Sequence, residues 1–153
     1  RDVVLNAFEE AGVKESTIRS QVTGEYRKRW LEAENGGDKA EANRIRKLLK
    51  ESGLDYDDED FENWWTDDAY DRLYEQIDAG EMNDAQKTRQ SIVTRTKDDS
   101  ASWSRITSYY AKKYKDLYKR DYNGAMRLKS KLIQLGMYES TIAKWEKQAK
   151  KTK

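Results

Sequence analysis

The side chains of this sequence that could do chemistry are carboxylates, amines, guanidinium groups and phenols, because its 153 residues include neither His nor Cys. Their absence removes the usual general base at neutral pH, the thiolate nucleophile and the commonest ligands of transition metals. The sequence also contains no Gly-rich phosphate loop and no G-x-S-x-G nucleophile motif. We therefore expect a protein that is not an enzyme and that binds no cofactor and no metal.

Residues 55–62 form the densest run of carboxylates, Asp-Tyr-Asp-Asp-Glu-Asp-Phe-Glu. Alternating carboxylates can wrap a calcium ion, but an EF-hand loop that began at Asp55 would need Gly in place of Asp60 and an acid in place of Thr66. The run therefore favours an acidic loop that leads into a helix. A pair of carboxylates can hydrolyse a glycosidic bond without His, so a carboxylate-dependent hydrolase is our second alternative function.

Tyrosines alternate with basic residues between residues 109 and 122. Proteins that bind single-stranded nucleic acid combine aromatic stacking with Lys and Arg that neutralise phosphates. The candidates for contact with nucleic acid are Lys112, Lys115, Lys119, Arg120, Lys129 and Lys131. We expect Tyr110 and Tyr114 in the core, which leaves Tyr109, Tyr118 and Tyr122 as candidate surface aromatics.

Charge is segregated along the chain, although its formal net charge is only +1. Residues 51–84 carry fourteen acidic residues and one base, for a net charge of −13, whereas residues 101–153 carry a net charge of +10. The simplest interpretation is solvated helix faces that attract one another within the fold. A nucleic-acid patch at the basic end and docking to a partner domain are the alternatives.

Helices must position these side chains, because the chain has no Pro and many strong helix formers. Gly-Val-Lys-Glu-Ser-Thr-Ile at residues 12–18 returns as Gly-Met-Tyr-Glu-Ser-Thr-Ile at residues 136–142. The sequence pattern that begins at Val22 returns at Ile106. Its second part, which begins at Asp38, returns at Asp121, so the second copy is one residue shorter at this point. A weaker copy of the pattern lies between the two. The sequence therefore predicts an all-α array of three helical-hairpin repeats of about 40–44 residues, preceded by a partial repeat, around a single core.

We interpret residues 1–153 as one helical-repeat domain made of a partial repeat over 1–21 and full repeats over 22–65, 66–104 and 105–153. The spacing of apolar residues predicts helices over 2–11, 16–34, 38–51, 58–65, 67–79, 83–97, 100–119, 123–134 and 139–150. Asp38 and Glu41 resemble a capping box, Thr66 is predicted to cap a helix, and Gly53 and Gly136 are placed to end helices. The expected core includes Tyr26, Trp30, Ile45, Leu49, Tyr110, Tyr114, Leu128 and Leu132.

The pattern from Tyr26 through Trp30, Gly37-Asp38, Arg44-Ile45-Arg46 and Gly53-Leu54 to Trp64 resembles a known short helical repeat, and Tyr110 to Trp145 provides a second match. The repeat occurs in very large multidomain ("polyvalent") proteins of tailed phages and prophages of Gram-positive bacteria. The resemblance implies an accessory region of a large phage protein that is packaged in the virion, and our overall interpretation is a non-enzymatic scaffold or interaction module of such a protein. It carries over no catalytic or ligand-binding residue.

The partners that this interpretation implies are other domains of the parent phage protein, or another phage or host protein, in the virion or the host cytoplasm. A nucleic-acid-binding module that uses the basic C-terminal repeat is the first alternative function. The chain begins at Arg1 rather than Met, so we expect it to be a piece of a longer chain. No window is apolar enough for a membrane span or a signal peptide, and we expect no membrane partner.

Overall fold

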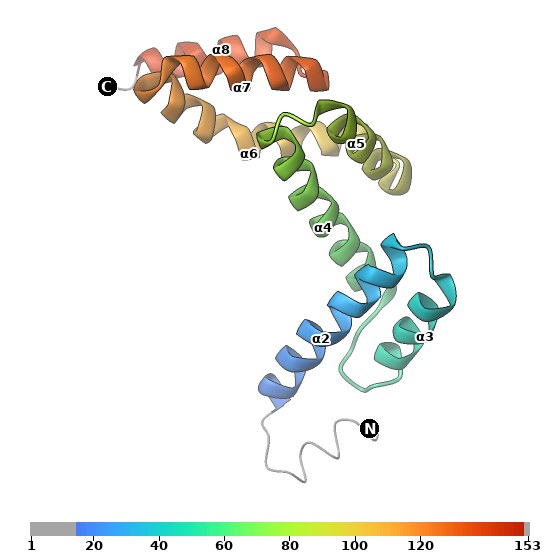
Figure 1. Ribbon diagram of the computed structural model, residues 1–153. Helices are drawn as coiled ribbons and strands as arrows, with labels where there is room; N and C mark the ends of the chain where they lie inside the picture. The colour runs from blue at the N-terminus through green and yellow to red at the C-terminus, as the bar shows by residue number, and fades with distance from the viewer. Residues whose placement is uncertain (1–14, 152–153) are drawn as a thin grey trace. The chain divides into compact units, whose positions relative to one another are not determined.

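The structure is a computed structural model that describes residues 15–151, apart from the side chains of Glu15, Ser16, Ile18 and Arg19. The predicted all-α fold is confirmed, since every regular element within this range is a helix (Figure 1). The predicted helix over 2–11 lies outside the described residues. The helices are α2 Glu15–Asn35, α3 Lys39–Lys50, α4 Asp58–Asp78, α5 Met82–Thr96, α6 Asp99–Arg120, α7 Tyr122–Leu135 and α8 Glu139–Lys151.

Three helices begin at an aspartate that caps them. The carboxylate of Asp38 accepts the backbone N–H of Glu41 at 3.1 Å, and Asp98 and Asp121 accept the N–H three residues on at 2.9 and 3.0 Å. Each bond satisfies one of the N–H groups that the first turn of a helix leaves unpaired. The capping box predicted at Asp38 is confirmed in this half only, because the Glu41 carboxylate binds Arg44 instead of returning to Asp38.

The predicted break between helices 58–65 and 67–79 is wrong, because α4 runs without interruption from Asp58 to Asp78. Thr66, the predicted cap, lies inside this helix, where its hydroxyl donates to the Glu62 carbonyl at 2.8 Å. A threonine that bonds to the preceding turn no longer competes with the helix. The buried side chains of Trp65, Ala69 and Leu73 continue one stripe at a spacing of four residues across the predicted break.

The chain divides into two compact units, residues 1–67 and residues 68–153, and α4 contributes to both. The boundary falls close to the 65/66 boundary that we predicted between the first two full repeats. In the first unit α2 packs against α3, and an aromatic cluster closes the core. The indole of Trp30 lies 5.4 Å from the ring of Phe61 and 6.3 Å from that of Trp64, and the Arg46 guanidinium lies 5.4 Å from the Trp30 ring.

In the second unit α6 packs against both α7 and α8, and the side chains of Ile106, Tyr110 and Tyr114 are fully buried. The predicted core is confirmed for Trp30, Ile45, Leu49, Tyr110, Tyr114, Leu128 and Leu132. Tyr26, which we also expected in the core, is only half-buried. The ring of Tyr110 is covered edge-on by Tyr74 of α4, whereas the ring of Tyr26 lies against the exposed guanidinium of Arg29.

Candidate functional site

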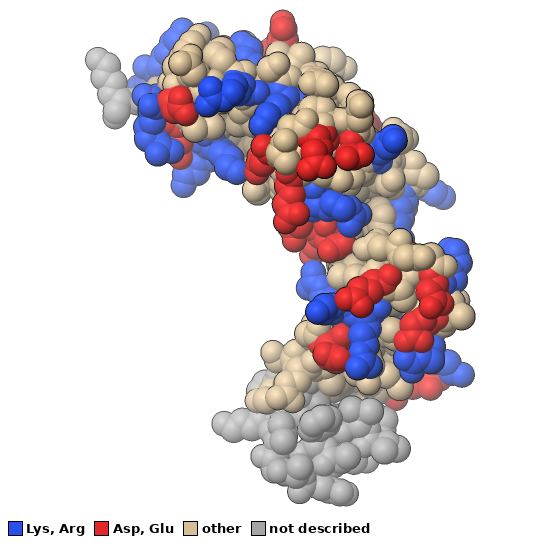
Figure 2. Space-filling model, in the orientation of Figure 1, with Lys and Arg blue, Asp and Glu red and all other residues tan. Residues whose placement is uncertain are grey.

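Four basic residues of the second unit lie at the C-terminal ends of two helices. Lys119 and Arg120 stand in the last turn of α6, and Lys150 and Lys151 stand in the last turn of α8. Figure 2 shows Lys and Arg side chains gathered over α7, α8 and the end of α6. Cations at these positions also stabilise the partial negative charge at a helix C-terminus, so this placement has a structural role of its own.

The six candidate nucleic-acid contacts do not share one environment. Lys112, Lys119 and Arg120 are exposed. The amine of Lys115 donates to the Gln148 side chain at 3.3 Å. The other two candidates are held by the fold: the Lys129 amine pairs with the Glu146 carboxylate at 3.3 Å, and the Lys131 amine donates to the Asp78 carbonyl at 3.0 Å.

Aromatic rings run from the core of the second unit to its surface at this basic end. The buried Tyr114 ring stacks with that of Tyr118 at 6.1 Å, and Tyr118 meets Tyr122 at 5.5 Å. Tyr122 is 57% exposed and Tyr109 is 43% exposed, which confirms both as surface aromatics, whereas Tyr118 is half-buried. Tyr109 is not a free platform, because one face of its ring stacks on Tyr74 at 3.7 Å.

The phenols of Tyr110 and Tyr114 are fixed by carboxylates. The Tyr110 hydroxyl donates to Asp78 at 3.3 Å, and the Tyr114 hydroxyl donates to Glu146 at 2.6 Å. Burial, followed by the adjacent carboxylate, raises the pKa of both phenols well above its usual value. Asp78 also lies 3.6 Å from the Lys113 amine, and this ion pair joins the acidic segment 51–84 to the basic segment 101–153.

The acidic run 55–62 is used to start α4. The Asp57 N–H donates to the Asp60 carboxylate at 2.9 Å, and the Asp60 N–H donates back to Asp57 at 3.0 Å. The Asp58 carboxylate lies 3.3 Å from Arg46 and pairs with Lys50, whose hydrogen bond is the main cause of a lowered Asp58 pKa. Among residues 15–151 there is no group of three or more acidic residues arranged to hold a metal ion.

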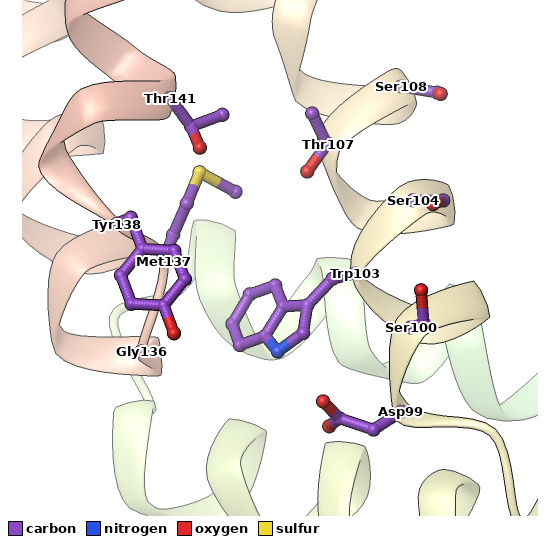
Figure 3. Close-up of a pocket in the computed structure, with 10 residues that line it drawn as sticks. All are labelled: Asp99, Ser100, Trp103, Ser104, Thr107, Ser108, Gly136, Met137, Tyr138 and Thr141. Atoms are coloured by element: carbon purple, nitrogen blue, oxygen red, sulfur yellow. The ribbon is translucent and has the colours of Figure 1, made fainter.

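The second unit also has an open groove that our sequence analysis missed. It has a volume of about 570 Å³ and lies between α6 and the connection from α7 to α8 (Figure 3). Hydroxyl groups and two aromatic rings line it: Ser100, Trp103, Ser104, Thr107, Ser108, Tyr138 and Thr141, together with Asp99, Gly136 and Met137. The sequence feature that could have indicated this groove is the difference in length between the loops of the two repeat copies, residues 51–57 and residues 136–138.

Trp103 forms one wall of this groove, which we call the Trp103 groove (Figure 3). The guanidinium of Arg89 lies 4.2 Å from the Trp103 ring and donates to the Asp99 carboxylate at 2.9 Å, so the indole is held in place from α5. Gly136 has a φ of +123°, and a Cβ there would lie 3.3 Å from the indole. Only glycine adopts this backbone readily while letting the indole approach so closely.

In comparisons with protein-family models, curated proteins and solved structures, nothing matched this chain. The candidate sites are therefore argued from their own geometry. No helix between Glu15 and Lys151 is long and apolar enough to cross a membrane.

Proposed function

We propose that this chain is an interaction module built from stacked helical hairpins. The observation that carries the proposal is the regular spacing of its helices. The long helices α2, α4 and α6 and the shorter α8 begin at Glu15, Asp58, Asp99 and Glu139, and α3, α5 and α7 begin at Lys39, Met82 and Tyr122. Successive starts in each series are therefore separated by about 40 residues, a period that is typical of helical-repeat arrays.

Equivalent positions of the two units have the same burial and the same capping role, which supports the repeat. When the two strong sequence copies are aligned, Val22 and Trp30 of α2 correspond to Ile106 and Tyr114 of α6, and all four are buried. The helix caps Asp38 and Asp121 also occupy equivalent positions. Ile45 corresponds to Leu128 and Leu49 corresponds to Leu132, and all four side chains are buried.

The proposed repeat is a hairpin of two helices. The helix predicted over 58–65, at the end of the first full repeat, is the beginning of the next long helix, α4. In such arrays each repeat contacts mainly its neighbours, and the array offers an extended surface to partners. We propose as partners other domains of a parent phage protein, or another phage or host protein, in the virion or the host cytoplasm.

The polar groups with well-defined partners support a structural role for the repeats. Asp38 and Asp121 cap helices, and the Arg44 guanidinium binds the Glu41 carboxylate through two bonds of 2.9 and 2.6 Å. The bonds from Arg44 lower the pKa of Glu41, and a hydrogen bond from Lys50 lowers the pKa of Asp58. A glycosidase acid needs the opposite shift, so the geometry favours the interaction module over the carboxylate-dependent hydrolase.

Binding of nucleic acid is the second candidate function. It is favoured by the position of Lys119 and Arg120 beside Tyr118 and Tyr122 at the end of α6. An exposed ring next to several cations can stack on a base while the cations neutralise phosphates. The same cations have a structural explanation as helix C-terminal charges, so we rank this function second.

Titration with labelled single-stranded and double-stranded DNA at two salt concentrations separates the two functions. For the interaction module we expect no binding at low salt. Micromolar or tighter binding would overturn it, provided that log affinity falls with log salt by about 0.7 per neutralised phosphate of a single strand. The variant Lys119→Gln/Arg120→Gln should then lose affinity, whereas the control Lys28→Gln/Lys47→Gln, at exposed positions of the first unit, should not.

A further inference from the structure

One side of the Trp103 groove, formed by Thr107 and Met137, has a counterpart in the first unit that is occupied by a tyrosine. In the alignment of the two copies Thr107 of α6 corresponds to Thr23 of α2, and the buried Met137 corresponds to the buried Leu54. In the first unit the hydroxyls of Thr23 and Tyr56 are hydrogen-bonded to each other. Tyr56 is only 7% exposed, and its ring meets Trp64 edge to face at 5.5 Å.

A difference in loop length explains why only one of the two places is filled. Seven residues, 51–57, connect α3 to α4, whereas three residues, 136–138, connect α7 to α8. The longer connection has room to turn Tyr56 back onto α2. Both connections contain a positive-φ glycine followed by a buried apolar residue, but in the shorter one α8 begins only two residues after Met137. Its tyrosine, Tyr138, is 79% exposed.

The chemistry of the open groove matches a tyrosine side chain. Thr107 and Thr141 face each other across it, with Met137 between them and the Trp103 indole below, as Figure 3 shows. An incoming phenol would find an apolar and aromatic wall for its ring, and hydroxyls that can both donate and accept for its oxygen. The volume of about 570 Å³ exceeds that of one phenol ring and leaves room for the neighbouring backbone.

We propose that the Trp103 groove binds a tyrosine of an extended segment of a partner protein, with the phenol hydroxyl bonded to Thr107 as Tyr56 is bonded to Thr23. The inference deepens the proposed function, and rests on it, because it names the chemistry by which the module holds a partner. Tyr138 lies at the rim of the groove, where it can pack against the arriving segment.

The test uses N-acetyl-L-tyrosinamide as the probe and follows the Trp103 indole N–H and the backbone amides of Thr107 and Gly136 by NMR. We expect saturable shifts confined to the groove. Thr107→Val, which keeps the shape but removes the hydroxyl, should weaken the affinity about five-fold, the effect of losing one hydrogen bond. Thr107→Ser should retain the affinity, and Thr94→Val on the exposed side of α5 should change nothing. N-acetyl-L-phenylalaninamide should bind more weakly and be insensitive to Thr107→Val.

Two results would overturn the proposal. One is the absence of saturable shifts at the groove, or equal loss of affinity in the Thr107→Val and Thr94→Val proteins. The other is a nuclear Overhauser contact between the Tyr138 ring and the Thr107 methyl in the free protein, with probe binding only after Tyr138→Ser, because the groove would then be filled by the chain itself. Neither result bears on the DNA titration, so the failure of this inference and the failure of the proposed function are distinguishable.

Discussion

The phenols of Tyr110 and Tyr114 lie inside the protein, where their surroundings favour the protonated form. Their pKa values lie above the value of about 10 that tyrosine has in an unfolded chain, because burial and a neighbouring carboxylate disfavour the phenolate. The stabilising effect is therefore fully present below pH of about 10. It is lost as the pH rises from there towards the folded-state pKa, because the unfolded chain releases these protons first.

We accordingly expect the free energy of unfolding to fall as the pH rises above about 10. Urea denaturation between neutral and alkaline pH measures this slope. The double variant Tyr110→Phe/Tyr114→Phe should be less stable at neutral pH but should lose less stability on the alkaline side. A slope that is unchanged in the double variant would assign the effect to other groups, such as lysines.

Burial also determines how Ser102 affects the free energy of unfolding. It is 1% exposed, and its hydroxyl has no hydrogen-bond partner in the described part of the chain. Leaving a buried hydroxyl unpaired costs about 1–3 kcal/mol. Ser102→Ala should therefore raise the free energy of unfolding by about 1 kcal/mol more than Ser104→Ala, which makes the same change at an exposed position of the same helix. Thermal denaturation that finds equal effects of the two variants would contradict this assignment.

At the scale of the element, a hydrogen bond between Tyr56 and Thr23 joins the connection between α3 and α4 to α2. We expect Tyr56→Phe and Thr23→Val each to destabilise the protein by about 1 kcal/mol, and the double variant to cost little more than either alone. Chemical denaturation of the four proteins measures the coupling energy. Additive effects would mean that the two hydroxyls do not support each other, and would remove the precedent for the groove.

Most of the helices could be predicted from the sequence because apolar spacing and capping residues report on local structure. The ends of α2 and α6 differ from the predicted ends by one residue on each side. Thr66 misled us because a threonine can cap a helix or bond back to the preceding turn, and only the packing around α4 decides which. The groove escaped prediction because it forms beside an unusually short connection, residues 136–138, and its walls come from segments that are distant in sequence.

At the scale of the whole molecule, the division into two compact units predicts that they open separately. Leu49→Ala in the first unit and Leu132→Ala in the second remove fully buried side chains, and each should cost about 2–5 kcal/mol. Hydrogen exchange should accelerate in α2 and α3 for the first variant, and in α6 and α7 for the second. Equal acceleration throughout the chain would instead support the single core that we predicted from the sequence.

The uninterrupted helix α4 limits where such a chain can be divided. Because this helix begins in one compact unit and ends in the other, a cut at residue 67 would leave each fragment with half a helix and unpaired backbone groups at the new ends. Cuts after Gly37 or Gly80 would leave long helices whole. Gene duplications and recombinant fragments that preserve folding should therefore have their junctions at connections between helices, such as those after Gly37 and Gly80, and not at the boundary of the compact units, which lies inside α4.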